Sequence, residues 1–263
     1  MSRNILTVPI QKVEGQSSAP FQDLLAVEEP LEIRLGKSTI SITMRTPGHD
    51  AELALGFLFS EGILPGPRDL QDVVSSKNLL TVHLKPDVEV DLDRLKRHFY
   101  TTSSCGVCGK ASIEALRMQA CPLASSESAV IASSVIHRLP AVLREDQRIF
   151  ERTGGLHAAA LFDSSGALLL VREDVGRHNA VDKLIGAELL AGHVPLQDKL
   201  LLVSGRTSFE LVQKALMAGV PILAAVGAPS SLAVETARRF NLTLLGFVRD
   251  DRFNIYSGAS RIQ

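Results

Sequence analysis

Hydrophobic and polar positions alternate near the start of the chain and follow helical spacing soon afterwards. Apolar and polar residues alternate on either side of Gly36-Lys37, which predicts a β-hairpin. Residues 50–62 then have the spacing of a helix, with Asp50 as its N-cap. Residues 79–84 are predicted to form a short strand.

Helical patterns dominate the middle of the chain. We expect helices over residues 91–99, 110–120, 128–137 and 140–152, because apolar residues recur there every three or four positions. A segment rich in Ser, Thr and Gly, residues 101–110, interrupts them. Its glycines predict a mobile loop.

The C-terminal part alternates strands with helices. A predicted hairpin with its turn at Ser164 to Gly166 comes first. The strands that follow are 199–204, 222–226, 242–248 and 253–256, and the helices are 179–190, 207–218 and 231–240. This alternation is typical of an α/β fold with a largely parallel sheet and right-handed crossovers.

These patterns predict an α/β protein with a smaller α+β part at its N-terminus. The expected division is a flexible arm over 1–25, an α+β subdomain over 26–100, a mobile cysteine loop over 101–110, a helical segment over 111–152 and an α/β domain over 153–258.

The loops after the predicted strands carry most of the candidate binding groups. In an open parallel sheet such loops meet at one edge, where helix N-termini also point and ligands bind. Arginine binds pairs of oxygens and glycine lets the backbone approach a ligand, so this edge suits a polyphosphate or a nucleotide. The alternative is that these residues only solvate turns and cap helices. The residues concerned are Arg172, Gly176, Arg177, His178, Gly205, Arg206, Gly227, Arg249 and Arg252.

Composition narrows the classes of partner. The 28 basic and 29 acidic residues nearly cancel, so no global field favours nucleic acid or an anionic membrane. The N-terminus lacks the apolar core of a secretory signal, and no apolar run approaches the roughly 20 residues that span a bilayer. We therefore expect a cytoplasmic protein that binds neither nucleic acid nor membrane.

Two of the three cysteines, Cys105 and Cys108, lie close together in the loop. Structural zinc needs four ligands, and no second pair recurs. A deaminase-type zinc site needs a Glu two positions after its His, but Ala159 follows His157 at that distance, and the cysteines come earlier in the chain. We expect a reactive thiolate and no permanent metal. Zinc, a redox disulfide and a plain buried pair remain alternatives, and Cys121 is expected to be a packing residue.

Five segments carry a resemblance to a known family. In order, "SSCGVCGK", "TGGLHAAA", "EDVGRHNAVDKLIG", "SGRTSFELVQKA" and "GFVRDDRFNIYS" resemble the FdhD family, the formate dehydrogenase accessory sulfurtransferases. The resemblance extends over about residues 25–258. It implies a fold like that of cytidine deaminases, a three-layer sheet with helices on both faces, without deaminase activity. It also implies a homodimer.

The resemblance further implies a reaction. Members of the family take sulfur from a cysteine desulfurase as a cysteine persulfide. They pass it to the molybdenum, or in some systems the tungsten, of a bis(molybdopterin guanine dinucleotide) cofactor before that cofactor enters formate dehydrogenase. Cys105 matches the persulfide-bearing cysteine and Cys108 its companion. The segment matched to cofactor binding comprises Phe247, Val248, Arg249, Asp250, Asp251 and Arg252.

Further contacts follow from the chemistry of this cofactor, which has phosphates and guanine at its ends and which a guanine nucleotide can mimic. We expect Asp250 and Asp251 either to accept hydrogen bonds from guanine or to face solvent. Asn179 and Asp182 are expected to stabilise the start of the helix that follows, and Ser208 and Glu210 to satisfy first-turn amides. The remaining expected contacts are Arg177, His178, Ser204, Gly205 and Arg206.

A rival function is that of a carrier, a cofactor- or guanine-nucleotide-binding chaperone whose cysteines only dock a partner. A zinc hydrolase and a general disulfide reductase are further alternatives. The sequence leaves all three open.

Overall fold

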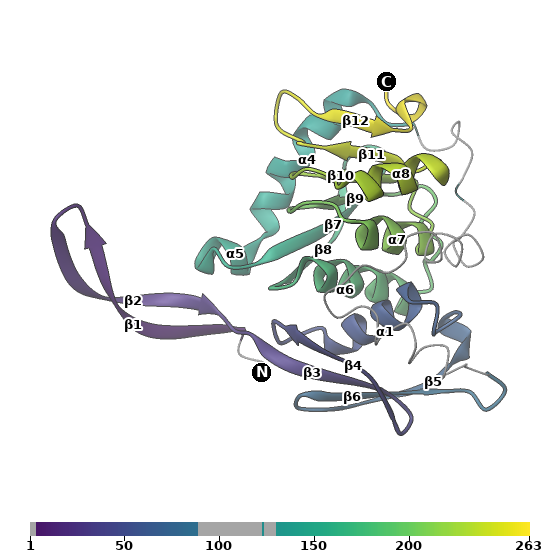
Figure 1. The fold of residues 1–263 in the computed structure, drawn as a ribbon, viewed down its shortest axis with the longest axis horizontal. Helices are drawn as coiled ribbons and strands as arrows, with labels where there is room; N and C mark the ends of the chain where they lie inside the picture. The colour runs from purple at the N-terminus through teal and green to yellow at the C-terminus, as the bar shows by residue number, and fades with distance from the viewer. Residues whose placement is uncertain (1–3, 89–122, 124–129) are drawn as a thin grey trace.

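The protein is built around two β-sheets with helices between them, and a two-stranded hairpin stands away from both (Figure 1). This computed structural model describes residues 4–88, 123 and 130–263. The predicted helices at 91–99 and 110–120, the cysteine loop and all three cysteines lie outside the described residues.

The larger sheet has six strands in the order β12-β11-β10-β9-β7-β8. β9, β10 and β11 are parallel, β7 is antiparallel to both β8 and β9, and β12 is antiparallel to β11. β8 therefore runs in the same direction as β9, β10 and β11, and all four deliver their carboxyl ends to one edge. The bounds are β7 His157–Phe162, β8 Leu168–Asp174, β9 Leu200–Val203, β10 Ile222–Ala225, β11 Thr243–Gly246 and β12 Asn254–Ser257.

Helices cover both faces of this sheet. On β7, Ala159 and Leu161 join the core under α6 (Arg177–Leu190), α7 (Phe209–Met217) and α8 (Ser231–Arg239), whereas Ala158 and Ala160 pack with α4 (Ser133–Asp146) on the other face. Strands covered on both faces are apolar throughout, as in the "LLLV" of β9. The three-layer α/β arrangement predicted from the sequence is confirmed.

The N-terminal part consists of a four-stranded sheet and one helix, α1 (Asp50–Ser60). Its strands are β3 Glu29–Leu35, β4 Ser38–Arg45, β5 Leu70–Ser76 and β6 Leu79–Leu84, in the order β4-β3-β6-β5, and a 3-10 turn, Pro67–Asp69, precedes β5. The hairpin around Gly36 and the strand at 79–84 are confirmed. β5 was not predicted, because its side chains are mostly exposed and no apolar alternation marks it.

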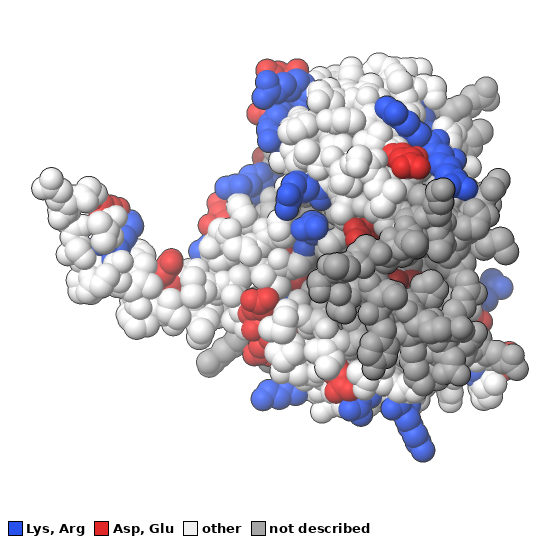
Figure 2. Space-filling model, viewed as in Figure 1, with Lys and Arg blue, Asp and Glu red and all other residues white. Residues whose placement is uncertain are grey.

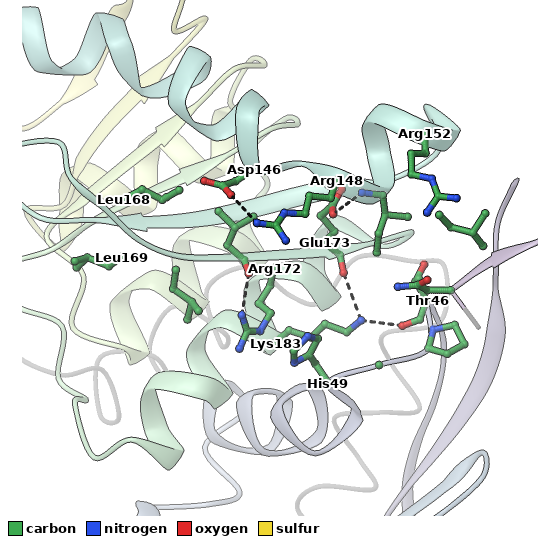
Figure 3. Close-up of a pocket in the computed structure, with 17 residues that line it drawn as sticks. Thr46, His49, Asp146, Arg148, Arg152, Leu168, Leu169, Arg172, Glu173 and Lys183 are labelled. Atoms are coloured by element: carbon green, nitrogen blue, oxygen red, sulfur yellow. Dashed lines mark hydrogen bonds and ion pairs between the residues drawn. The ribbon is translucent and has the colours of Figure 1, made fainter. Parts of the chain in front are cut away.

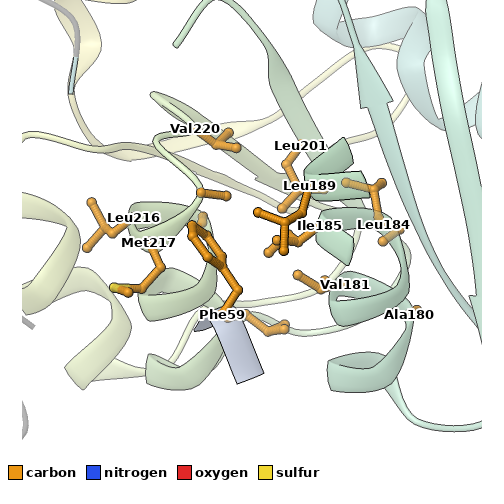
Figure 4. Close-up of a cluster of buried hydrophobic side chains, with 14 of the residues drawn as sticks. Phe59, Ala180, Val181, Leu184, Ile185, Leu189, Leu201, Leu216, Met217 and Val220 are labelled. Atoms are coloured by element: carbon orange, nitrogen blue, oxygen red, sulfur yellow. The ribbon is translucent and has the colours of Figure 1, made fainter. Parts of the chain in front are cut away.

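Two glycines let α1 and α6 cross at very short range. A Cβ atom on Gly56 would lie 1.8 Å from the backbone oxygen of Asp182, and one on Gly186 would lie 1.8 Å from the backbone oxygen of Glu52. Phe59, one turn further along α1, lies among side chains of α6 and α7 (Figure 4). A single hydrophobic core therefore joins the N-terminal part to the larger sheet.

The loose arm expected over residues 1–25 is a β-hairpin in the described residues. β1 (Ile5–Glu14) and β2 (Ser17–Ala26) pair antiparallel through ten residues each and turn at Gly15, which has φ 61°. The hairpin extends away from the body (Figure 1), and its surface carries few charges (Figure 2). Because most of its residues are exposed on both faces, no buried face marks its period in the sequence.

Two further expectations about helices are wrong. The helices predicted at 128–137 and 140–152 are α4, which runs unbroken through Pro140, and α5 (Arg148–Thr153). Proline removes one backbone donor, but α4 buries an apolar stripe against the sheet that holds the helix together. The N-cap of α1 is His49 in the left-handed conformation, and Asp50 instead pairs with Arg45 at 2.9 Å.

The last residues form a 3-10 turn, Ala259–Arg261. Among the described helices, none combines the length and the apolar character needed to cross a membrane.

Substitution of the crossing glycines tests how much the fold depends on this contact. We expect Gly56→Ala or Gly186→Ala to lower the free energy of unfolding by about 1–3 kcal/mol or more, because the added methyl group meets backbone that cannot move aside. Urea unfolding measures this change. The control is Gly66→Ala, where the nearest atom to an added Cβ is 3.7 Å away. Equal stability of the Gly66 and Gly56 variants would contradict the close crossing.

Candidate functional site at the carboxyl edge of the larger sheet

The loops that follow β8, β9, β10 and β11 lie against one another at one edge of the sheet. Backbone hydrogen bonds join the loops after β9, β10 and β11. The N–H of Gly227 donates to the carbonyl of Gly205 (3.0 Å), that of Thr207 to Ala228 (3.1 Å) and that of Phe247 to Gly227 (3.1 Å). The predicted convergence of these loops is therefore confirmed. We call this surface the rim, comprising His157 and residues 174–178, 204–210, 226–230 and 246–252.

Glycine makes the close contact between these loops possible. A Cβ atom on Gly227 would lie 2.8 Å from the backbone oxygen of Gly205 and 2.9 Å from backbone atoms of Arg206. A Cβ atom on Gly205 would lie 3.2 Å from Nδ1 of His157. The rim therefore exposes backbone where larger residues would separate the strand ends.

The carboxylate of Asp174, at the end of β8, organises the first rim loop. It is fully buried and accepts hydrogen bonds from the backbone N–H of Gly176 (2.9 Å) and the side-chain amide of Asn179 (2.9 Å). It also accepts a hydrogen bond from the backbone N–H of Thr46 (3.2 Å) and pairs with Nζ of Lys183 at 2.7 Å. One carboxylate thus fixes β8, the start of α6 and the N-terminal part relative to one another.

Asn179 and Asp182 have roles different from the expected one at the helix start. Asn179 lies inside α6, and its amide also donates to the carbonyl of Met44 at 2.8 Å. Asp182 is buried between helices, where it accepts hydrogen bonds from Nζ of Lys214 (2.8 Å) and from the hydroxyl of Ser60 (3.1 Å). Burial raises the pKa of Asp182 to about 6, so the Asp182–Lys214 pair is charged at neutral pH. Both residues belong to the scaffold beneath the rim.

Arg177 and His178 project from this scaffold into the rim. Nε2 of His178 lies 3.2 Å from the hydroxyl of Ser208, the residue before α7. Nε of Arg177 is buried and has no hydrogen-bond partner in the described residues. Burial, followed by the charges of Arg177 and Lys214, lowers the pKa of His178 to about 4. The imidazole is therefore neutral at physiological pH and can both donate and accept a hydrogen bond.

His157 was not among the predicted contacts, although it lies at the rim. It begins β7, which is antiparallel to β9 and so starts where β9 ends. Its ring lies beside Gly205, and burial together with the charge of Arg177 lowers its pKa. The sequence did contain a signal for this position. The predicted hairpin makes its first strand antiparallel to the strands that follow, so the start of that strand lies at the edge where the others end.

The remaining residues of the second rim loop differ in accessibility. Arg206 is exposed and available to a ligand. Ser204 accepts a hydrogen bond from the backbone N–H of Ala158 at 2.9 Å, so its hydroxyl stabilises the junction of two strands. Glu210 lies beside His178, with 4.0 Å between Oε2 and Nε2. Ser208 is the N-cap of α7, but its side chain forms no capping hydrogen bond with the described residues. The expectation that it satisfies first-turn amides is therefore wrong.

The segment from Phe247 to Arg252 combines a strained aromatic residue with charged neighbours. Phe247 has φ 54°, and its side chain is 42 % exposed. Such a conformation is costly for an aromatic residue and is concentrated at functional sites. The side chain of Val248 is fully buried in the core. Arg249 donates to the carbonyls of Val226 and Val248, at 2.8 and 2.9 Å, and so closes the loop.

The last three residues of that segment, Asp250, Asp251 and Arg252, are exposed, so their side chains are free to meet a ligand. Arg172 is not at the rim, contrary to expectation. Its guanidinium pairs with Glu52 on α1, with 2.8 Å between Nη2 and Oε1. This ion pair between half-buried side chains holds α1 to β8. The rim therefore has one cation fewer than the sequence predicts.

In the described part of the chain, no group of three or more His, Cys, Asp or Glu side chains is placed to hold a metal ion. The rim is instead a surface of arginines, neutral histidines, backbone amides and an exposed aromatic ring. These groups have the chemistry that an anionic ligand with planar rings requires, and they stand on a three-layer α/β sheet.

Comparison with known proteins identifies the family. Residues 26–263 match the model of the FdhD/NarQ family. The chain is 53% identical over 251 residues to the sulfur carrier protein FdhD of Streptomyces coelicolor, covering 91% of this chain and 89% of the relative. It is 50% identical over 253 residues to the sulfur carrier protein FdhD of Mycobacterium tuberculosis, covering 91% and 92%. The chain belongs to the FdhD/NarQ family.

A solved structure shares the fold. It comes from Desulfotalea psychrophila and is described as a formate dehydrogenase accessory protein. The two chains superpose with a TM-score of 0.79 at 24% identity, over 98% of this chain and 99% of the other. At that identity the likeness concerns the fold alone.

The neutral state of His178 can be measured by proton NMR. We expect the Cε1–H resonance that disappears in His178→Gln to titrate with a midpoint near 4, since burial and two cations disfavour the charged ring. Because this pKa lies below the ordinary histidine value of 6.5, neutral His178 stabilises the fold above pH 6.5, and that contribution is lost as the pH falls toward 4. A midpoint near 6.5 would show that the ring is not enclosed as the structure has it.

Proposed function

We propose that this protein is a sulfurtransferase that prepares the molybdenum or tungsten bis(molybdopterin guanine dinucleotide) cofactor for formate dehydrogenase. In this proposal, it accepts sulfur from a cysteine desulfurase as a persulfide on Cys105. The relatives are sulfur carrier proteins by name, which supports the sulfur-transfer part. The structural neighbour is named a formate dehydrogenase accessory protein, which supports the link to formate dehydrogenase. We further propose that it works as a homodimer in the cytoplasm.

The observation that carries the proposal is the rim. Arg177, Arg206 and Arg252 come from three different segments of the rim, and guanidinium groups on neighbouring segments suit a polyphosphate chain, which supports the proposal. Exposed Phe247 offers a face on which a pterin or guanine ring can stack. Asp250 or Asp251 is the candidate acceptor for the donors on the edge of guanine. The cofactor is cargo here and not a resident group.

The first sulfur-transfer step balances without any further reactant. The thiolate of Cys105 attacks the outer sulfur of the donor persulfide, the donor S–S bond breaks, and the donor leaves as a thiolate. The outer sulfur is then bound to Cys105 as a new persulfide. Attack of the Cys108 thiol on the inner sulfur would release hydrosulfide and form a Cys105–Cys108 disulfide, so Cys108 is the candidate for delivering sulfur to the cargo.

The rival carrier function shares the rim but not the sulfur chemistry. A cofactor- or guanine-nucleotide-binding chaperone would need the arginines and would use Cys105 and Cys108 only to dock a partner. The two functions therefore separate on the cysteines alone. Formate dehydrogenase that is fully sulfurated in cells carrying Cys105→Ala would favour the chaperone.

Persulfide formation can be tested by intact mass. After incubation with a cysteine desulfurase and cysteine, we expect one added sulfur that a reductant removes and that maps to the peptide containing Cys105. Cys105→Ser should abolish the addition, because the nucleophile is lost. Cys121→Ser is the matched control and should retain it. Equal loading of the Cys105 and Cys121 variants would rule out the assignment.

Nucleotide binding at the rim can be tested separately, with guanosine diphosphate as the probe. We expect Arg206→Ala to weaken its affinity about 10- to 100-fold, the effect of removing one charged hydrogen bond. Isothermal titration calorimetry measures the dissociation constant. Arg34→Ala is the control, since Arg34 lies on β3 and pairs with Glu32. An unchanged constant for Arg206→Ala would remove that residue from the proposed site.

A further inference from the structure

The second edge of β8 lies open in a groove away from the rim, and Arg172, which was predicted at the rim, lines this groove instead. Within the described sheet, β8 pairs with β7 alone. A cavity of about 760 Å³ follows the strand from Leu168 to Glu173. Residues of α4 and α5 form one wall, and residues 46–49 with Lys183 of α6 form the other (Figure 3). We call this cavity the β8 groove.

The backbone of β8 presents hydrogen-bonding groups to this groove. The carbonyl of Val171 accepts from Nη1 of Arg172 (2.9 Å), that of Glu173 accepts from Nζ of Lys183 (3.4 Å), and the N–H of Val175 donates to the hydroxyl of Thr46 (3.3 Å). None of these partners lies on β7. Since backbone groups alternate sides along the regular part of an antiparallel strand, the N–H groups of Val171 and Glu173 also point away from β7.

Two of the usual devices that prevent edge-to-edge pairing, proline and lysine, are missing from β8, although its register shifts between Leu168 and Leu170 and it ends in charged residues. Its seven residues, "LLLVRED", include no proline and no lysine, and Leu169 is 47 % exposed. An edge of this length and character pairs readily with another extended chain. The groove between two helical layers limits such a partner to a single strand.

The charges of the groove select an acidic occupant. Arg172 is paired with Glu52 and Lys183 with Asp174, and the carboxylate of Glu173 accepts the first backbone N–H groups of α5. The arginines on the α5 wall form weaker ion pairs, or none, with the described residues. The side chain of Arg148 is 85% exposed and lies 4.0 Å from Asp146, and exposed Arg152 has no ion pair with any described residue.

We propose that the β8 groove binds an extended acidic segment of a partner protein, which adds to the sheet as a strand beside β8. Main-chain hydrogen bonds donated by the N–H groups of Val171 and Glu173 supply the affinity. Arg148 and Arg152 pair with carboxylates on the added strand and supply the preference for acidic sequences. This proposal does not depend on the proposed sulfur transfer, because the residues of the groove differ from those of the rim.

A labelled peptide tests the proposal on the full-length protein. The probe is an acetylated, fluorescein-labelled peptide of eight residues that alternates valine and glutamate, followed by fluorescence anisotropy. We expect saturable binding, with backbone amide shifts in ¹⁵N NMR confined to β8 and the walls of the groove. Arg148→Glu combined with Arg152→Glu should weaken binding at least about tenfold and leave the fold intact, because both side chains are exposed.

Two modified peptides separate strand addition from simple charge attraction. A peptide N-methylated at every second residue, on the edge that pairs with β8, should lose binding, because those N–H groups form the ladder. The same methylation on the opposite edge should leave binding unchanged. A peptide that alternates valine and lysine should bind at least about tenfold more weakly than the glutamate peptide.

Three outcomes would overturn the proposal. Absence of binding at 1 mM probe, on the order of the weakest specific affinities, is one. Equal binding of the two N-methylated peptides is another, because it would exclude a strand ladder. The third is self-association by analytical ultracentrifugation that Leu169→Arg abolishes while the peptide does not compete, since a second copy of the chain would then occupy the groove.

Discussion

The buried carboxylate of Asp174 is the contact on which the arrangement of the rim depends. Four donors converge on it, from β8's own loop, from α6, from the N-terminal part and from the buried Lys183. A buried carboxylate is costly unless it is paired and hydrogen-bonded, so these partners hold one another in place. The loop that leads into Arg177 and His178, at the start of α6, is therefore fixed in direction. This part of the rim is in place without a ligand.

Close packing of backbone gives the second constraint. α1 and α6 meet through Gly56 and Gly186, and the rim loops meet through Gly205 and Gly227. At each of these places a methyl group would meet another residue at short range. The first pair joins the two sheets into one core. The second keeps the loops after β9, β10 and β11 close together, so that arginines of different loops lie on one surface of a nearly neutral protein.

The sequence predicted the elements of the larger sheet well, because its strands are apolar throughout and its helices have clear periods. It predicted less where a face is exposed, as in the β1–β2 hairpin and β5, since no burial marks their alternation. Among rim residues, Arg177, His178 and Arg206 were found from the strand order. Val248 and Ser204 proved to serve the core and a strand junction, which adjacency in the sequence does not distinguish.

By itself the sequence determined the α/β class, the family resemblance and the cysteine pair, because these rest on local period and on the spacing of motifs. Only the tertiary structure decided which charges remain available. Arg172 is paired with Glu52 from a distant segment and Lys183 with buried Asp174 at the end of β8, whereas Arg206 and Arg148 are left exposed. Whether a charged side chain meets a partner inside the fold depends on contacts between residues far apart in the chain, and a linear pattern does not contain those distances.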